Sequence, residues 1–350
     1  MATRLLKKSL ALALSVVFIG TAQANDPAAF NTEGFSDLVA AKFGDVEPDN
    51  VHKVLSAGKV SDTLLVSLAP NKMINFAHPF PQPTMTYIPS SARNLLALGG
   101  LGGHGNMISM EKIISLKPDL IIDVGSVGQS YVDTVKRVHE KTKVPVVLVD
   151  GNFADTPQQI LTVSKYIGDT KKGERLANYA QRILDMTKDA TQINGIAKSV
   201  YYARGVDGLE TAPINSIHSE VLNWVGLKNV VDMKSQKSTA RISMEQLYKW
   251  QPDIIVTQDP SAYQHIQTSP LWHQLKAVQE KDVYLVPNKP FGWLGQPPSV
   301  NRLLGALWLT HKLDPKRLDT HDYLNFVKNY FQLFYDYQLT PQDEKSLGIL

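Results

Sequence analysis

The sequence predicts an α/β protein made of two similar lobes, and three observations lead to this prediction. Residues 108–122 (ISMEKIISLKPDLII) return as residues 242–256 (ISMEQLYKWQPDIIV), at a constant offset. Each copy begins near a serine, which is a preferred helix cap, and ends in a short apolar run. Strand-like and helix-like segments alternate along the rest of the chain, as in parallel sheets with helical crossovers. A repeat of this size is too large for a solenoid unit, so it favours a duplicated lobe with a cleft between the copies.

Each copy of the repeat is expected to form a short helix followed by a buried strand. Ser109 and Ser243 precede the helices, and Pro118 and Pro252 end them because the residue before proline avoids the α region. The apolar runs that follow are short and rich in β-branched residues, like the buried strands of a parallel sheet.

The first 24 residues have the features of a secretory signal peptide. Three basic residues precede an apolar stretch over residues 10–19, and small residues at 21–24 favour cleavage after Ala24. The apolar stretch is shorter than the roughly 18 residues that a membrane-spanning helix needs. The chain has no cysteine, so we expect no lipid anchor, no disulfide and no thiol chemistry. The mature protein is therefore expected to be exported and soluble.

The composition of the mature chain argues against several classes of function. Removal of the signal peptide lowers Lys+Arg from 36 to 33, against 33 Asp+Glu, so the basic face of a nucleic-acid binder is not expected. The sequence contains no HExxH, GxSxG or GK[ST] phosphate loop. Its nine histidines show no metal-site spacing, so a dedicated site for a bare metal ion is not predicted either.

The other elements follow from local patterns. The predicted elements are strands over 61–69, 144–150, 198–204 and 282–287, helices over 34–42, 71–78, 130–141, 156–167, 171–192 and 214–225, and a helical region over 299–350. The helix over 171–192 keeps apolar residues at helical spacing and would be a stiff connector between the lobes. The predicted parts are a signal peptide (1–24), an N-terminal extension (25–58), an N-terminal lobe (59–169), a connecting helix (170–194) and a C-terminal lobe (195–350).

Three segments resemble the periplasmic substrate-binding proteins of ABC importers for iron-siderophores, cobalamin and related metal chelates. The segments are residues 111–122, 243–256 and 286–305, the last with Phe-Gly-Trp, Pro-Pro-Ser and Asn-Arg-Leu-Leu-Gly sequences. The resemblance covers roughly residues 60–320. It implies an α/β fold of two Rossmann-like lobes with mainly parallel sheets, joined by one long α-helix, with the ligand cleft between the lobes. It also implies a monomer in the periplasm that binds no nucleic acid.

The resemblance further implies that one glutamate of each lobe docks on the permease, at Glu111 and Glu245 by position. A carboxylate in the first turn of a helix is exposed and is favoured by the helix dipole, which is consistent with that role. The alternative is that the two glutamates are surface residues that act only as capping groups.

The loops after the strands supply the candidate ligand-binding residues, because the crevice of an open α/β sheet lies beyond the carboxyl ends of its strands. His104 lies in a glycine-rich loop and could ligate a chelated metal or hydrogen-bond the chelate. Arg204 ends a predicted strand, and its forked donors suit carboxylate, catecholate or hydroxamate oxygens. The alternatives are a solvent-facing histidine and an arginine paired with Asp207 or Glu210.

Aromatic residues are further candidates. Trp293, between two glycines, is expected to expose its indole as a stacking platform, with core packing as the alternative. Tyr131 and Tyr263 are weaker ligand-binding candidates on the loops after two strands.

Together these features predict a solute-binding protein that is not an enzyme and has no cofactor of its own. The expected ligand is a chelated metal ion, with Fe(III) as a siderophore favoured and Ni(II) possible, and the expected partner is an inner-membrane ABC permease. A nickel-chelate, cobalamin or oxyanion carrier is the alternative within the class. A periplasmic enzyme on the same two-lobed frame is the alternative from another class, and it would need an acid/base pair in the cleft.

Overall fold

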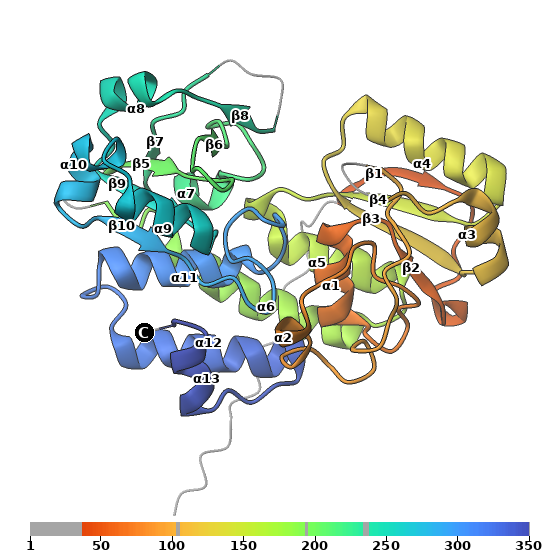
Figure 1. The fold of residues 1–350 in the computed structure, drawn as a ribbon. Coiled ribbons are helices and arrows are strands. Elements are labelled where there is room, and N and C mark those ends of the chain that lie inside the picture. The colour runs from red at the N-terminus through yellow and green to blue at the C-terminus, as the bar shows by residue number, and fades with distance from the viewer. Residues whose placement is uncertain (1–36, 103–105, 193–194, 234–237, 350) are drawn as a thin grey trace, which may run out of the picture.

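A computed structural model describes residues 37–102, 106–192, 195–233 and 238–349. The predicted signal peptide and His104 lie outside the described residues. Two α/β lobes lie side by side, each with its own mainly parallel sheet, so the predicted fold class is confirmed (Figure 1).

The sheet of the N-terminal lobe has the strand order β1-β4-β3-β2. The strands are β1 (Val39–Phe43), β2 (Val54–Ser56), β3 (Leu120–Gly125) and β4 (Val146–Asp150). All neighbours are parallel except β1, which runs antiparallel to β4 at the edge. One face of the sheet packs on α1 (Lys59–Leu68) and α5 (Thr156–Tyr166), and the other packs on α3 (Met110–Leu116) and α4 (Gln129–Thr142).

The sheet of the C-terminal lobe has the order β10-β9-β5-β7, and all its strands are parallel. The strands are β5 (Ser199–Tyr202), β7 (Lys228–Asn229), β9 (Ile254–Thr257) and β10 (Val283–Leu285). The helices of this lobe are α7 (Glu220–Trp224), α8 (Met244–Trp250), α9 (Pro260–Thr268) and α10 (Lys276–Gln279). A short antiparallel pair, β6 (Glu210–Thr211) and β8 (Ala240–Arg241), stands apart from the sheet.

The repeated segments form α3–β3 in one lobe and α8–β9 in the other, as the repeat predicts. Ser109 and Ser243 cap the two helices by accepting from the backbone N–H three residues later. The aspartate that follows each proline makes the same kind of hydrogen bond in both lobes. Asp119 accepts from the backbone of Lys53 at 2.8 Å, and Asp253 accepts from the backbone of Ser199 at 2.8 Å. Each aspartate thereby ties the start of its own strand to the neighbouring strand segment.

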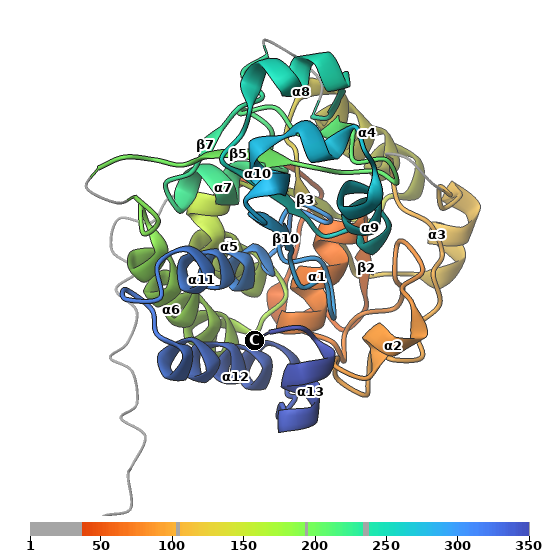
Figure 2. The ribbon, with the colours of Figure 1, turned by 60° about the vertical axis from the view of Figure 1, so that its left-hand side comes forward.

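The lobes are joined by a packed helical layer rather than by one isolated helix. The predicted connector is α6 (Thr170–Thr187), which packs on α5, α11 (Arg302–Leu313) and α12 (Thr320–Tyr335). Figure 2 shows these helices gathered on one side of the two sheets. One apolar core runs from the N-terminal sheet through this layer into the C-terminal sheet, while a smaller core covers the outer face of each sheet.

The domain boundaries predicted from the sequence need two corrections. Strands β1 and β2 belong to the N-terminal sheet, so residues 37–58 are part of that lobe and not an extension, and residues 39–43 are a strand rather than a helix. The C-terminal end of the chain leaves its lobe. Helix α12 packs on α1, and Tyr87 of the N-terminal lobe makes edge contacts with Phe331 and Tyr337, just before α13 (Pro341–Ser346).

Three local predictions need correction. The segment predicted as a strand over 61–69 is helix α1, which is buried on nearly all sides and therefore lacks the polar face that would have marked it as a helix. Thr63 and Ser67 donate to carbonyl oxygens within the helix, whereas Ser61 and Asp62 accept from the backbone N–H groups of Val124 and Ala77 outside it. Residues 71–78 form turns instead of a helix, and the helix predicted over 214–225 is only α7.

Candidate ligand site between the lobes

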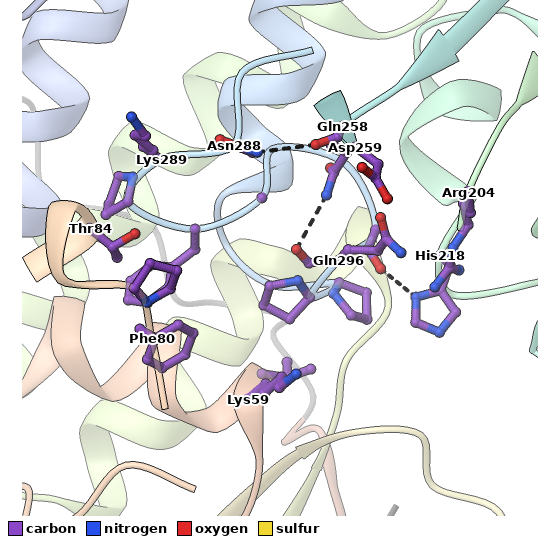
Figure 3. Close-up of a pocket in the computed structure, with 18 of the residues that line it drawn as sticks. Lys59, Phe80, Thr84, Arg204, His218, Gln258, Asp259, Asn288, Lys289 and Gln296 are labelled. Atoms are coloured by element: carbon purple, nitrogen blue, oxygen red, sulfur yellow. Dashed lines mark hydrogen bonds between the residues drawn. The ribbon is translucent and has the colours of Figure 1, made fainter. Parts of the chain in front are cut away.

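A cavity of about 720 Å³ lies between the two lobes. From the N-terminal lobe it is lined by the start of α1 and by the proline-rich segment that ends in α2 (Gln82–Met85). From the C-terminal lobe it is lined by residues that follow β5, β9 and β10, so it lies beyond the carboxyl ends of those strands as expected. In Figure 3, Arg204 and His218 lie together at one end of the cavity, and Phe80 and Thr84 lie at the other.

Arg204 lines this cavity and is only 7 % exposed. With the amide oxygen of Gln296 turned towards it, its Nε and Nη2 donate to that oxygen at 3.1 Å each. Nη2 also lies 3.8 Å from Glu210, and the guanidinium lies over the ring of Tyr202. Nη1 is buried and has no hydrogen-bond partner among the residues that the structure describes. A buried cationic donor without a partner costs free energy, so an acceptor that reached this nitrogen would stabilise it.

Of the two alternative partners of Arg204, Glu210 does form an ion pair with it at 3.8 Å, whereas Asp207 pairs with another residue. Asp207 is bound by Arg241, whose guanidinium donates to both carboxylate oxygens on the surface. This pair lowers the pKa of Asp207 and leaves Arg204 to face the cavity.

His218 is the second polar group at this end of the cavity. Its Nδ1 lies 2.5 Å from the carbonyl oxygen of Gly295, which can only accept, so Nδ1 carries the proton and Nε2 is an acceptor. Burial, and next the positive charge of Arg204, lower the pKa of His218 to about 4. The imidazole is therefore neutral at neutral pH, and Arg204 supplies the positive charge at this end.

The loop over residues 288–298, called the cleft loop below, forms most of the C-terminal wall. The side chain of Gln258 holds it from within, because Nε2 donates to the Gln296 carbonyl at 3.2 Å and Oε1 accepts from the Leu294 N–H at 2.5 Å. Asn301, which follows the cleft loop, also holds it by donating to the Phe291 carbonyl at 3.0 Å. The wall is therefore fixed before any ligand arrives.

Trp293 is not the exposed platform that its flanking glycines suggested. It is fully buried, and its Nε1 donates to the Lys289 carbonyl at 2.9 Å. The two flanking glycines instead allow the backbone of the cleft loop to pack closely against its neighbours. A Cβ at Gly292 would lie 2.1 Å from the Gln296 oxygen, and one at Gly295 would lie 2.1 Å from the His218 oxygen. Trp293 supports the cleft loop from the core side.

The charged side chains that line the cavity are Lys59, Arg204, Lys289 and Asp259. Asp259 caps α9, with Oδ1 accepting from the backbone of Ser261 at 2.8 Å. The lining is therefore net positive and suits an anion. Among the described lining residues Asp259 is the one carboxylate, so the cavity holds no pair of carboxylates there.

The other predicted residues are placed elsewhere. Tyr131 is exposed at the start of α4, and Tyr263 packs against the outer core of the C-terminal lobe; neither lines the cavity. Glu111 and Glu245 are fully exposed in the first turns of α3 and α8. A backbone hydrogen bond and the Ser109 hydroxyl lower the pKa of Glu111, and the Ser243 hydroxyl and a backbone hydrogen bond lower that of Glu245, so both are anionic.

Sequence reasoning missed His218, Gln258 and the N-terminal wall. His218 follows β6, a two-residue strand that leaves no periodic signal. The proline-rich segment at residues 79–83 breaks regular secondary structure, and a run of prolines also makes a rigid wall. Gln296 lines the cavity three residues after Trp293, in the same loop as that candidate.

The chain matches a protein-family model described as periplasmic binding protein over residues 76–290. It belongs to the periplasmic binding protein family. This binding protein is therefore a substrate-binding component of ABC importers, a class that delivers small ligands to membrane permeases. Among its described residues, no helix has the length and apolar character needed to cross a bilayer.

Three relatives illustrate the similarity. An ABC transporter solute binding protein from Sulfurospirillum deleyianum has 27% identity and a TM-score of 0.79, over 89% of this chain and 100% of its own. The molybdate-binding protein MolA of Haemophilus influenzae is 23% identical over 69% of this chain and 74% of its own length. An iron-uptake system-binding protein of Bacillus subtilis is 24% identical over 75% of this chain and 81% of its own length.

Proposed function

We propose that this binding protein is exported to the periplasm, captures an anionic metal complex between its lobes and presents it to an inner-membrane permease. The preferred ligand class is a ferric siderophore or a related ferric chelate. The observation that carries the proposal is the buried guanidinium of Arg204, which lines the cavity and whose Nη1 has no hydrogen-bond partner among the described residues. Carboxylate, hydroxamate and catecholate oxygens on a ferric complex are acceptors that suit this donor.

The charge of the cavity supports an anionic ligand. Lys59 and Lys289 add positive charge to that of Arg204, and Asp259 alone opposes them among the described lining residues. His218 stays neutral and offers an acceptor at Nε2, which suits a hydroxyl or amide donor on the ligand.

The size and the surface of the cavity support a chelate of moderate size. About 720 Å³ lies within the roughly 300–1,000 Å³ range of sites that bury a drug-sized ligand. Because Trp293 is buried and the described aromatic lining consists of Phe80 and Phe291, a broad stacking surface for cobalamin is not present among the described residues. A nickel chelate remains an alternative ligand.

A metal oxyanion is the second candidate ligand. The net positive lining would serve such an anion as well, and one relative of this chain is named a molybdate-binding protein. A bare oxyanion would fill little of the cavity, which is why a larger anionic complex is preferred.

Delivery to the permease is proposed to use Glu111 and Glu245. Both are exposed and anionic, both stand in the first turn of a capped helix, and each lobe carries one. Two matched carboxylates suit a partner that presents cationic side chains to both lobes at once.

The ligand class can be tested by calorimetric titration of the purified protein. The panel is ferric citrate, a ferric hydroxamate, a ferric catecholate, nickel–histidine, cobalamin and molybdate. We expect the tightest binding from an anionic ferric complex. Tightest binding of molybdate would select the second candidate, and no heat with any member of the panel would end the proposal.

A further inference from the structure

Arg302 belongs to the Asn-Arg-Leu-Leu-Gly sequence, to which the ligand site assigns no role. It begins α11 and is only 1 % exposed. Its Nε donates to the Ser299 carbonyl at 3.2 Å, and its Nη1 donates to Glu220 Oε2 at 2.6 Å and to the Ile217 carbonyl at 3.1 Å. Its Nη2 donates to the Gly151 carbonyl at 2.6 Å. One side chain therefore holds three separate segments.

These contacts cross from one lobe to the other. Gly151 and Phe153 follow β4 of the N-terminal lobe, whereas Glu220 begins α7 of the C-terminal lobe. Glu220 makes a second crossing, since its Oε2 also accepts from the Phe153 N–H at 2.8 Å. The guanidinium of Arg302 lies 5.3 Å from the ring centre of Phe153. Arg302, Glu220, Gly151 and Phe153 together form what we call the interlobe clasp.

The clasp stands where the lobes are not continuously packed. Cavities of about 520 and 280 Å³ are both lined by Glu220 together with residues of both lobes. Beside the apolar contact between Phe153 and Trp224, the polar contacts of the clasp therefore connect the lobes at this place. A hydrogen-bonded ion pair has strict directional requirements, so it restricts rotation of one lobe against the other more than its net free energy suggests.

The clasp is also connected to both polar parts of the ligand site. Ile217 and Glu220 flank His218, so contacts to Arg302 fix the segment that carries the imidazole. Ser299 and Arg302 directly follow the cleft loop, so the same guanidinium fixes the end of that loop. A change in the clasp would therefore reach the ligand site through two short segments.

We infer that Arg302 is a positioning residue: the interlobe clasp fixes the angle between the lobes and holds the cleft at its binding width before the ligand arrives. The effect on affinity rests on the proposed function, because it takes the interlobe cavity as the ligand site. The effect on the lobe angle does not, so the two can fail separately.

The lobe angle can be measured without any ligand. The chain has no cysteine, so Arg137→Cys on α4 and Lys249→Cys on α8 place one spin label on each lobe at exposed positions. We expect a single narrow distance distribution in the otherwise unchanged protein, and a clearly broader one when Arg302→Met is added. The matched control is Arg317→Met, because Arg317 also donates to carbonyl oxygens but lies exposed on the surface; its distribution should stay narrow.

A paired variant separates positioning from simple stability. Arg302→Met with Glu220→Leu removes both charges, and replacing a buried ion pair by apolar residues is often neutral for folding. We expect this variant to unfold at nearly the temperature of the parent and yet keep the broad distance distribution. It also covers the case in which Arg302→Met alone does not fold. A narrow, unshifted distribution in a folded variant without Arg302 overturns the inference.

The effect on binding is tested with ferric citrate as the probe. We expect the paired variant to bind about tenfold more weakly, with Arg317→Met unchanged. If the parent protein binds no ferric citrate, the proposed ligand class is weakened, while the distance measurement still decides the role of the clasp.

Discussion

The two walls of the ligand cleft differ in how firmly their polar groups are held. On the C-terminal wall, Arg204 is buried beside Gln296 and His218 is bonded to Gly295, so both groups are oriented in advance. On the N-terminal wall, Lys59 is exposed at the start of α1, and the proline-rich segment offers mainly apolar surface. We therefore propose that the C-terminal lobe recognises the ligand and the N-terminal lobe covers it. Preorganised donors give affinity because little ordering remains to be done on binding.

The largest expected effect comes from removing the fixed cation. Arg204→Ala should weaken binding of the anionic ligand by about 10- to 150-fold, the range of a hydrogen bond to a charged group at about 1.5–3 kcal/mol. Lys59→Ala should weaken it by about fivefold or less, because an exposed ion pair contributes only about 0–1 kcal/mol. Calorimetric titration of both variants measures the ratio. Equal losses of binding affinity in the two variants would show that the two walls do not differ in how they bind the ligand.

The second effect concerns His218 and the loss of folding stability at acidic pH. The pKa of His218 is about 4 in the folded protein and near 6.5 in the unfolded chain, so between these values the unfolded chain binds more protons. The free energy of unfolding therefore falls as the pH is lowered from 6.5 to 4. His218→Asn should remove up to about 3 kcal/mol of that fall. Denaturant unfolding of both proteins at pH 4, 5, 6 and 7 measures it; parallel pH profiles would show that His218 is not the cause.

A smaller effect is expected at the contact that closes the cleft between the walls. Phe80 meets Phe291 of the opposite lobe edge to face, with ring centres 4.8 Å apart, and also meets Phe76 at 5.3 Å. Phe80→Leu should cost about 1 kcal/mol of stability through loss of these ring contacts, and ligand affinity should fall a few-fold. Phe43→Leu, on β1 away from the cavity, is the matched control and should leave affinity unchanged. A loss of affinity in both would point to general destabilisation.

The smallest effect on ligand affinity is expected at the docking glutamates. Glu111→Gln and Glu245→Gln should leave titrations unchanged because both side chains are fully exposed and outside the cavity. Stimulation of permease ATPase activity in proteoliposomes should fall in each single variant and fall further in the double variant. Full stimulation by the double variant would remove the docking proposal, and a fall in only one single variant would show that the lobes dock unequally.

The sequence predicted well wherever an element repeats a local rule. The α3–β3 and α8–β9 units follow from Ser109 and Ser243 as caps, from the prolines that end the helices, and from apolar runs of strand length. The strand-end rule likewise selected Arg204 and the cleft loop, because parallel strands direct their carboxyl ends to one edge.

Prediction failed where tertiary packing decides. Helix α1 is surrounded by core, so its apolar run carries no period that separates a helix from a strand. The glycines around Trp293 suggested an open loop, but they are required because the backbone there packs closely against the backbone of His218 and Gln296. Such tertiary contacts leave no local pattern in the sequence. The partner of Arg302 is 82 positions away, so no local pattern could reveal the clasp.

The apolar core that runs through both sheets has a consequence for denaturation. Because α1, α5, α6, α11 and α12 share one set of buried contacts, neither half can lose its interior without exposing that of the other. Heating should therefore produce a single calorimetric peak whose measured enthalpy equals the van't Hoff enthalpy, as in a two-state transition. Although the chain carries two sheets, it should melt as one cooperative unit.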